Sequence, residues 1–220
     1  GGWGLDLDEL AQSQRRLARH APATALAITM HHYWIGIATQ LERWGDTSLT
    51  WMLEAAADGQ VFAAGHAEAG NDIPLLLSSS KADRVDGGWE FTGHKSFGSL
   101  SPVWTHLGVH AMDTSDPEAP QVVHGFVSRD ADRYHIEQTW DVLGMRATES
   151  NDTILDRTFV PDSQISLVCP AGFAGAALLV TGGRLGFAGE YALGYAAALG
   201  SALVWSTYSL ATKRFAALPT

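Results

Sequence analysis

The chain changes texture twice along its length, and these two changes constrain its fold more than any other feature. From about Leu7 to Asp58, apolar residues recur at three- or four-residue steps, which is typical of amphipathic helices. From Val61 to Val160, runs of four to eight residues alternate with turn residues, which is typical of strands. From Ala171 onward Ala, Gly and Leu dominate, and one long helix is predicted over about Arg184–Phe215. Helices, then strands, then a helix predict an α+β fold.

The helical part divides at turn and capping residues. Pro22 suits the first turn of a second helix. After the stop at Gly45, Asp46 or Thr47 can cap a short helix that ends near Asp58. The first domain is therefore predicted over residues 1–59.

The middle part, residues 60–165, is predicted to be an antiparallel β-barrel or sandwich of six or seven short strands. Asp86–Gly88 has the composition of a hairpin turn, and the alternation in Trp89–Phe91 suits a half-buried strand. Further strands are predicted over Leu107–Met112, Val122–Ser128 and Thr153–Val160. Residues 166–220 are predicted to begin a second helical domain.

Composition excludes several classes of protein. The formal net charge of -10 argues against a nucleic-acid-binding or anionic-membrane surface. The single cysteine, Cys169, excludes an internal disulfide and a Cys-rich metal site. A reducing compartment is the simple interpretation, and no secretory signal is present in these residues, so a cytoplasmic location is expected.

One run allows a membrane alternative. Tyr191–Thr212 has no charged side chain and is about long enough to span a bilayer. Its six hydroxyl-bearing residues between Ser201 and Thr212 favour a soluble bundle helix instead, and no membrane span is predicted. The small residues in the run suit either environment.

Three motifs follow one another in the strand-rich part: Gly65–Asp72, Gly93–Ser99 and Leu143–Ser150. In this order they resemble the middle domain of the acyl-CoA dehydrogenase family, flavoenzymes that desaturate acyl thioesters. The resemblance extends over nearly all 220 residues but over only part of a typical family chain. It begins inside the family's amino-terminal helical domain and stops before several further helices, so a fragment, a partly ordered protein or a shortened family member is expected.

The resemblance implies FAD as cofactor and an acyl-CoA as substrate. Phe97 replaces the tryptophan that flanks the flavin ring, and Ser99 replaces a threonine that can hydrogen-bond it. The cofactor site is completed by residues of the two glycine motifs and by an arginine that reaches the pyrophosphate, often in a neighbouring subunit: His66, Ala67, Asn71, Gly98 and Arg214. Asn71 would also meet the substrate. Ala67 stands where the family usually has a threonine hydroxyl. We expect the 65–71 loop, Phe97 and Ser99 to gather in one cleft.

The same resemblance points to a base and to partners. Abstraction of the proton α to a thioester needs a carboxylate beside the flavin. Glu190 fits a position that a minority of the family uses, although an ordinary helix-face carboxylate is the alternative. Arg146 is expected to be structural support, paired with Asp141 or Glu149. An electron-transfer flavoprotein as electron acceptor and a homodimer or homotetramer are also implied.

Other chemistry is less favoured by the sequence. His106 and His110 are four residues apart but have no acidic partner at metal-ligand spacing, so no metal is predicted. No Gly-x-Ser-x-Gly elbow for Ser-His-Asp hydrolysis is present. Two alternatives to the dehydrogenase remain: a flavin-dependent monooxygenase or oxidase of the same fold, and a catalytically inactive partner subunit of a heteromeric enzyme.

Overall fold

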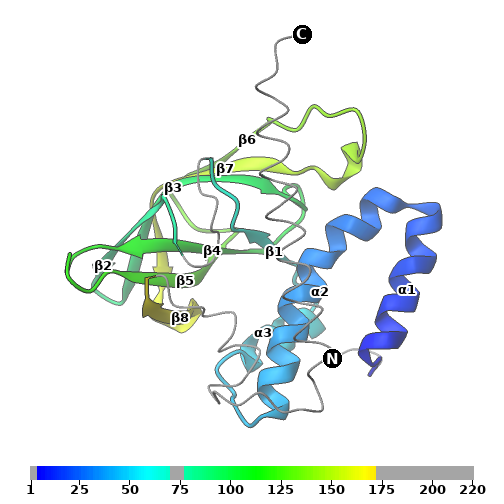
Figure 1. The fold of residues 1–220 in the computed structure, drawn as a ribbon, viewed down its shortest axis with the longest axis horizontal. Helices are drawn as coiled ribbons and strands as arrows, with labels where there is room; N and C mark the ends of the chain where they lie inside the picture. Colours follow the sequence, from blue (N-terminus) through cyan, green and yellow to red (C-terminus); the bar gives the residue numbers. More distant parts are fainter. Residues whose placement is uncertain (1–3, 70–76, 172–220) are drawn as a thin grey trace. The chain divides into compact units, whose positions relative to one another are not determined.

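The computed structural model describes residues 4–69 and 77–171. Three helices come first, α1 (Leu7–His20), α2 (Pro22–Arg43) and α3 (Thr50–Ala57), and α1 packs beside α2 (Figure 1). A capping box starts α1: Glu9 N donates to Asp6 Oδ1 (2.8 Å) and Asp6 N donates to Glu9 Oε2 (3.0 Å). Pro22 occupies the first turn of α2, as predicted.

The predicted cap of α3 is wrong. The residue before the helix is Leu49, which makes no side-chain capping bond. Asp46 Oδ1 instead accepts a hydrogen bond from Ser48 N (2.9 Å), because a short Asp side chain readily closes a turn on its own backbone. The end of α3 at Asp58 agrees with the prediction.

Eight strands follow in the described residues, together with two short 3₁₀ helices. The strands are β1 (Phe62–Gly65), β2 (Lys81–Val85), β3 (Gly88–Gly98), β4 (His106–Asp113), β5 (Gln121–Ser128), β6 (Tyr134–Glu137), β7 (Asn151–Pro161) and β8 (Ile165–Pro170). The 3₁₀ helices are η1 (Arg146–Thr148) and η2 (Asp162–Gln164). The predicted hairpin turn joins β2 to β3, and Gly87 takes the positive φ of 76° that such a turn requires.

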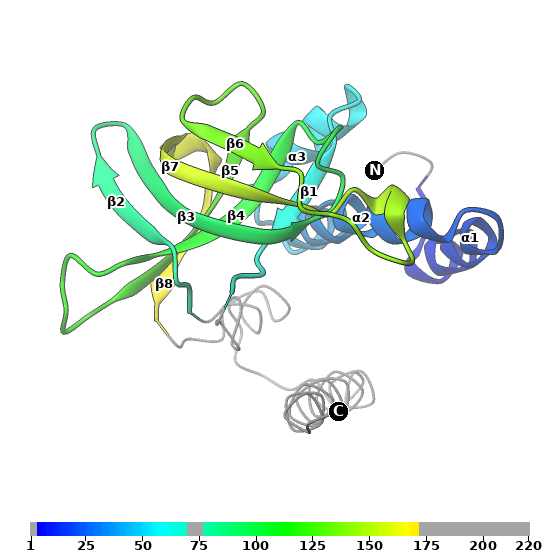
Figure 2. The ribbon, with the colours of Figure 1, turned by 90° about the horizontal axis from the view of Figure 1, so that it is seen from above.

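The prediction of an antiparallel barrel or sandwich is wrong in two respects. The strands form one sheet in the order β6-β7-β3-β2-β4-β5-β8, with β1 beside β4, and within the described part no pairing joins β6 to β8 to close it. The pairs β1–β4 and β2–β4 are parallel. The sheet is curved, with β3 arching across it (Figure 2). Local alternation predicts a strand but not which neighbour it pairs with.

Two cores lie on opposite faces of β4, whose residues are buried on both sides. Leu107 and Val109 belong to the core within the curved sheet. The other core packs Trp34 of α2 against Phe62 and Phe126 of the sheet. Gly108 makes this approach possible, because a Cβ atom there would overlap the Trp34 ring. The helices and the sheet therefore share one buried interface.

The predicted helix over Arg184–Phe215 and residues 172–220 of the predicted third domain lie outside the described residues; the first residues of that domain, 166–170, belong to β8. None of the helices in the described part is both long and apolar enough to span a bilayer.

Candidate functional site

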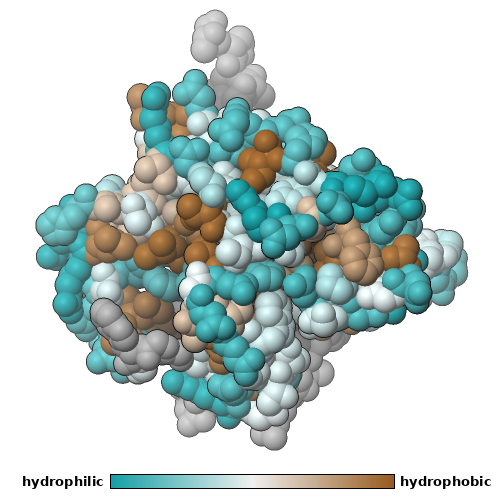
Figure 3. Space-filling view, turned by 180° about the vertical axis from the view of Figure 1, so that it is seen from behind, coloured by the Kyte–Doolittle hydropathy of each residue, from teal (hydrophilic) through white to brown (hydrophobic). Residues whose placement is uncertain are grey.

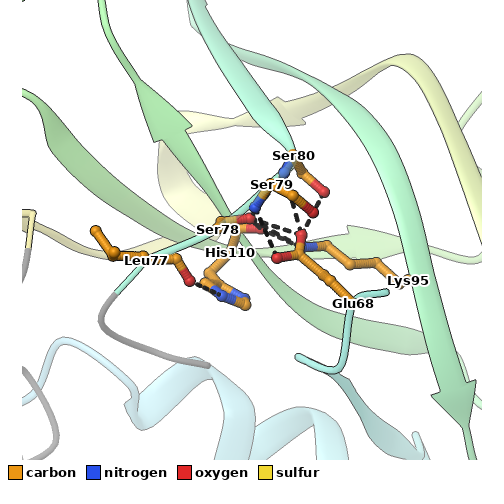
Figure 4. Close-up of polar contacts among 7 residues, drawn as sticks. All are labelled: Glu68, Leu77, Ser78, Ser79, Ser80, Lys95 and His110. Carbon is orange, nitrogen blue, oxygen red and sulfur yellow. Dashed lines mark hydrogen bonds and ion pairs between the residues drawn. The ribbon is translucent and has the colours of Figure 1, made fainter. Parts of the chain in front are cut away.

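One carboxylate ties together three segments: the residues after β1, the residues before β2, and β3. Glu68 follows β1, and its side chain is fully buried. It accepts hydrogen bonds from Ser78 Oγ (2.7 Å), Ser80 Oγ (2.6 Å) and Ser79 N (2.8 Å), as Figure 4 shows. Lys95 Nζ of β3 lies 2.5 Å from the same carboxylate. The first glycine motif is thus fastened both to the residues before β2 and to β3.

The Glu68–Lys95 pair remains ionised at neutral pH. Burial alone would raise the pKa of Glu68, but the Lys95 ammonium and the serine donors hold this pKa well below its usual range. Burial lowers the pKa of Lys95 to about 8, although the Glu68 carboxylate raises it. Both pKa values are lowered: the ammonium and the serine donors outweigh burial at Glu68, whereas at Lys95 the cost of burying the ammonium exceeds the attraction that it receives. Lys95 also donates to His110 O (2.5 Å), which anchors it further.

Three imidazoles lie next to this pair. The ring centroid of His66 is 5.3 Å from that of His110 and 6.3 Å from that of His124. Burial, with the nearby Lys95 charge, lowers the pKa of His110 to about 3, and burial likewise holds the pKa of His66 well below its usual value. These two rings are therefore neutral at physiological pH. In the described part of the chain, no group of three or more His, Cys, Asp or Glu side chains is arranged to hold a metal ion.

A strained corner lies beyond Lys95 on β3. A bulge interrupts the pairing with β7 between Lys95 and Gly98, and Phe97 adopts a φ of 59°. This left-handed conformation is rare for a bulky residue, and such strain gathers at binding sites. Phe97 is 63% exposed, although aromatic residues favour burial. Phe97 therefore presents a flat apolar surface outward at a cost in backbone strain.

The third motif packs against this corner. Leu100 N donates to Thr148 O (3.0 Å), and Ser99 Oγ lies 2.7 Å from Ser150 Oγ. Leu100, Met145 and Glu149 also have positive φ angles, of 68°, 58° and 46°. Four of the six such non-glycine residues in the described part of the chain thus lie at one place in the fold. This clustering marks the corner as the candidate functional site.

Trp140 extends the aromatic surface. Its ring meets that of Phe97 edge-on, with the centroids 6.1 Å apart. Its backbone N donates to Asn151 Oδ1 (3.0 Å) and its indole Nε1 donates to Met145 O (3.2 Å), so the third motif fixes the indole in place. Figure 3, which views the molecule from behind Figure 1, shows apolar side chains in separate patches among hydrophilic ones, so an exposed ring is not unusual by itself. The backbone strain distinguishes Phe97.

Arg146 has the supporting role that the motif predicts. Its Nε donates to Val142 O (2.8 Å), and its Nη2 lies 3.6 Å from Asp141 Oδ1 in an exposed ion pair. Both contacts hold the turn that carries Met145 and Thr148.

The predicted cofactor residues are only partly brought together. Ala67 O accepts from Ser96 N (2.9 Å), so the first motif lies beside the bulge, as expected. His66, however, points into the imidazole cluster and packs against Trp34. Gly98 is buried, and a Cβ there would come within 3.0 Å of Asn151 O. Asn71, Glu190 and Arg214 lie outside the described residues.

Sequence reasoning did not assign roles to Glu68, Lys95, Trp140, Thr148 or Ser150. A signal for the first pair was available: alternation along β3 puts Lys95 on the face of Trp89 and Phe91, and a buried lysine needs a carboxylate. No local signal could pair Ser99 with Ser150, because they are 51 residues apart.

No family model matches the chain. Among curated proteins it is 28% identical over 167 residues to YdbM of Bacillus subtilis, which is named for the acyl-CoA dehydrogenases, and the match covers 75% of this chain. It is 29% identical over 181 residues to an L-evernosamine nitrososynthase from Micromonospora, with 78% of this chain covered. A pigment production hydroxylase from Rhodococcus erythropolis is 26% identical over 246 residues, a match that covers 96% of this chain and 57% of the hydroxylase.

Solved structures agree with these relatives. The structure of a nitrososynthase from Micromonospora carbonacea var. africana superposes with a TM-score of 0.63 at 27% identity, over 79% of this chain and 44% of that one. KijD3, in complex with FMN and a dTDP-linked amino keto sugar, gives a TM-score of 0.63 at 25% identity, over 76% of this chain and 40% of KijD3.

A separate, shorter match is to a protein named as an exporter. The chain is 40% identical over 76 residues to an aromatic amino acid exporter, YddG, from Ancylobacter novellus, and this match covers 30% of the chain and 25% of the exporter.

The solved structures similar to this chain include a protein in complex with FMN, KijD3. This chain spans 43% of the length of YdbM and 41% of the nitrososynthase. The resemblance found in the sequence is confirmed: over part of their length, the chain is similar to a protein named for the acyl-CoA dehydrogenases and to proteins of acyl-CoA dehydrogenase-like kind.

Proposed function

We propose that this chain is part of a flavin-dependent monooxygenase whose flavin ring lies on Phe97. The observation that carries the proposal is the exposed Phe97 side chain, held at a positive φ two residues before Ser99, whose backbone N donates to Phe97 O (2.8 Å). A flat apolar face next to a hydrogen-bonding hydroxyl is what an isoalloxazine ring requires. KijD3, a structural neighbour, binds FMN, which supports a flavin here.

Each site residue would have its own role in binding the cofactor. Phe97 would stack on the ring, Trp140 would bound it on one side, and Ser99 would hydrogen-bond its polar edge. Glu68 and Lys95 would hold the Ala67 backbone against β3. When bound, a reduced flavin supplies the two electrons with which one atom of dioxygen enters the substrate and the other leaves as water.

The similar proteins favour oxygen insertion over acyl-CoA dehydrogenation. The named relatives include a nitrososynthase and a hydroxylase beside one protein named for the dehydrogenases. Ala67 also lacks the hydroxyl that the dehydrogenase resemblance implies near the ring. Dehydrogenation of an acyl-CoA with FAD, with Glu190 as base, is the second candidate, and the YdbM match supports it. An electron-transfer flavoprotein belongs to that second candidate only.

A homodimer or homotetramer, in which Arg214 reaches a neighbour's cofactor, stays part of the proposal. Its motivation is the Ala- and Gly-rich composition of residues 184–215, which needs burial. A monodisperse monomer in light scattering of the full chain would contradict it.

The exporter match motivates a different proposal for the end of the chain. We infer that this match falls on the uncharged run Tyr191–Thr212, whose composition suits a membrane helix better than any described segment. This membrane helix is an alternative to the roles proposed above for Glu190 and Arg214, because it would leave neither side chain at a flavin. The full chain would then sediment with membranes while a chain ending at Ala171 stays in the supernatant. Equal partition of both would overturn this inference.

Two assays of the full chain separate the candidate reactions. With reduced FMN or FAD, ¹⁸O₂ and a primary amine as probe, a monooxygenase transfers one labelled atom to the amine, as mass spectrometry would show. With FAD and an acyl-CoA under anaerobic conditions, a dehydrogenase bleaches the flavin absorbance. Bleaching without labelled product would replace the monooxygenase proposal by the dehydrogenase.

A further inference from the structure

We infer that Thr148 and Ser150 orient the Ser99 hydroxyl as a hydrogen-bond acceptor, so that the site prefers reduced over oxidised flavin. The inference rests on the proposed flavin site. It starts from three hydroxyls in a row: Thr148 Oγ1 lies 2.7 Å from Ser150 Oγ, which lies 2.7 Å from Ser99 Oγ. Thr148 and Ser150 are buried, and Ser99 is the partly exposed end of the row.

The inner end of the row fixes its direction. Thr148 Oγ1 lies 2.9 Å from Met145 O, and a carbonyl oxygen can only accept, so Thr148 donates to it. A hydroxyl has one hydrogen, so Thr148 must accept from Ser150. Ser150 in turn accepts from Ser99. The hydrogen of Ser99 therefore points inward, and its lone pairs remain for a ligand.

The opposite direction is less stable. For Ser99 to donate outward, all three hydroxyls must rotate and Thr148 must give up Met145 O. That carbonyl also accepts from Thr148 N (3.0 Å) and Trp140 Nε1 (3.2 Å), so it would keep two donors, but one buried hydrogen bond is lost. One such bond corresponds to about a fivefold change in an equilibrium constant.

The direction of these hydrogen bonds determines which oxidation state of the flavin Ser99 binds better. The ring nitrogen N5 accepts hydrogen bonds when the flavin is oxidised and carries an N–H donor when it is reduced. An accepting Ser99 complements the N–H donor. Thr148 and Ser150, which do not touch the ring in this account, act as positioning residues through Ser99.

The test is the ratio of dissociation constants for oxidised and reduced flavin, measured anaerobically with FMN and with FAD on the full chain. In Thr148→Val, Ser150 loses its inner acceptor and donates to Ser99, whose hydrogen then points outward. We expect the preference for reduced flavin to fall by about fivefold in Thr148→Val and to be retained in Thr148→Ser. Ser99→Ala should lose the preference as well. Near-UV circular dichroism checks that each variant is folded.

The outcomes separate this inference from the proposed function. Tight flavin binding with the same ratio in wild type, Thr148→Val and Ser99→Ala overturns the inference and leaves the proposed function intact. Failure of the wild-type chain to bind either flavin overturns both. If Thr148→Val does not fold, Ser99→Ala decides: the same ratio of dissociation constants in Ser99→Ala as in wild type overturns the inference.

Discussion

At the scale of single residues, the chain places strain and buried charge beside each other on β3. Lys95 points inward to a fully buried carboxylate, and two residues later Phe97 points outward at a positive φ. The inward lysine anchors the strand, and the bulge that follows turns the aromatic ring to the surface. The anchored residue thus supports the exposed one.

Phe97→Ala should weaken flavin binding by about tenfold, because a stacked aromatic ring contributes about 1.4 kcal/mol, near the upper end of the range for such contacts. Fluorescence titration of the full chain measures this. Phe159→Ala removes another exposed phenylalanine of the same sheet and should leave flavin affinity unchanged. Equal losses in the two variants would show that the ring of Phe97 has no special role.

Glu68→Gln should destabilise the fold by about 3–5 kcal/mol, because it leaves the buried Lys95 ammonium without its counter-charge. Urea unfolding followed by tryptophan fluorescence measures the loss. Lys81→Ala breaks an ion pair with Asp83 whose two side chains are 61% and 44% exposed, and should cost less than about 1 kcal/mol. A loss in Glu68→Gln as small as that of Lys81→Ala would contradict the anchoring role.

At the scale of elements, the helices attach to the sheet through α2, which lies against β1 and carries Trp34 into the core. Trp34 Nε1 donates to Ala63 O (2.9 Å), so the indole is fixed by a hydrogen bond as well as by packing. The close contact at Gly108 explains why β4 tolerates a glycine in its interior, where it otherwise weakens a strand.

Gly108→Ala should therefore destabilise the protein by about 1–3 kcal/mol, since the new methyl group overlaps the Trp34 ring. Gly36→Ala is the matched control, because Gly36 lies within α2 and a Cβ there meets nothing within 4 Å. That change should stabilise the helix by about 0.5–1 kcal/mol. Thermal unfolding of both variants checks the opposite signs, and equal shifts would refute the packing argument.

At the scale of the whole molecule, local patterns predicted the elements better than their arrangement. The alternation in Trp89–Phe91 and the Asp86–Gly88 turn located the β2–β3 hairpin correctly, because both signals lie within a few residues. The parallel β1–β4 pairing joins residues more than 40 apart and has no local signal. Likewise, the motifs located Phe97 and Ser99, but the strain at the corner and the Thr148–Ser150 row depend on φ angles and long-range contacts.

Acid should destabilise the folded protein in two stages. His110 has a pKa of about 3 when folded and 6.5 ordinarily, so the unfolded chain binds more protons between these values. Stability should fall as the pH drops below 6.5, by at most about 1.4 kcal/mol per pH unit for this residue. The depressed pKa of Glu68 adds a further loss below its ordinary value of 4.5. Unfolding free energies measured from pH 7 to pH 4 test this, and His110→Gln should reduce the slope below pH 6.5, where the lowered pKa of His66 accounts for a remaining part. A stability that is constant between pH 7 and pH 5 would contradict it.

The central claim is that a flavin ring rests on Phe97 beside Ser99. Anaerobic titration of the full chain with FMN and FAD, each oxidised and reduced, tests it most directly through quenching of tryptophan fluorescence. The account predicts saturable binding of one flavin per chain, tighter for the reduced form, and about tenfold weaker in Phe97→Ala but not in Phe159→Ala. The claim is contradicted if the chain binds none of the four flavin forms, or if Phe97→Ala leaves flavin affinity unchanged.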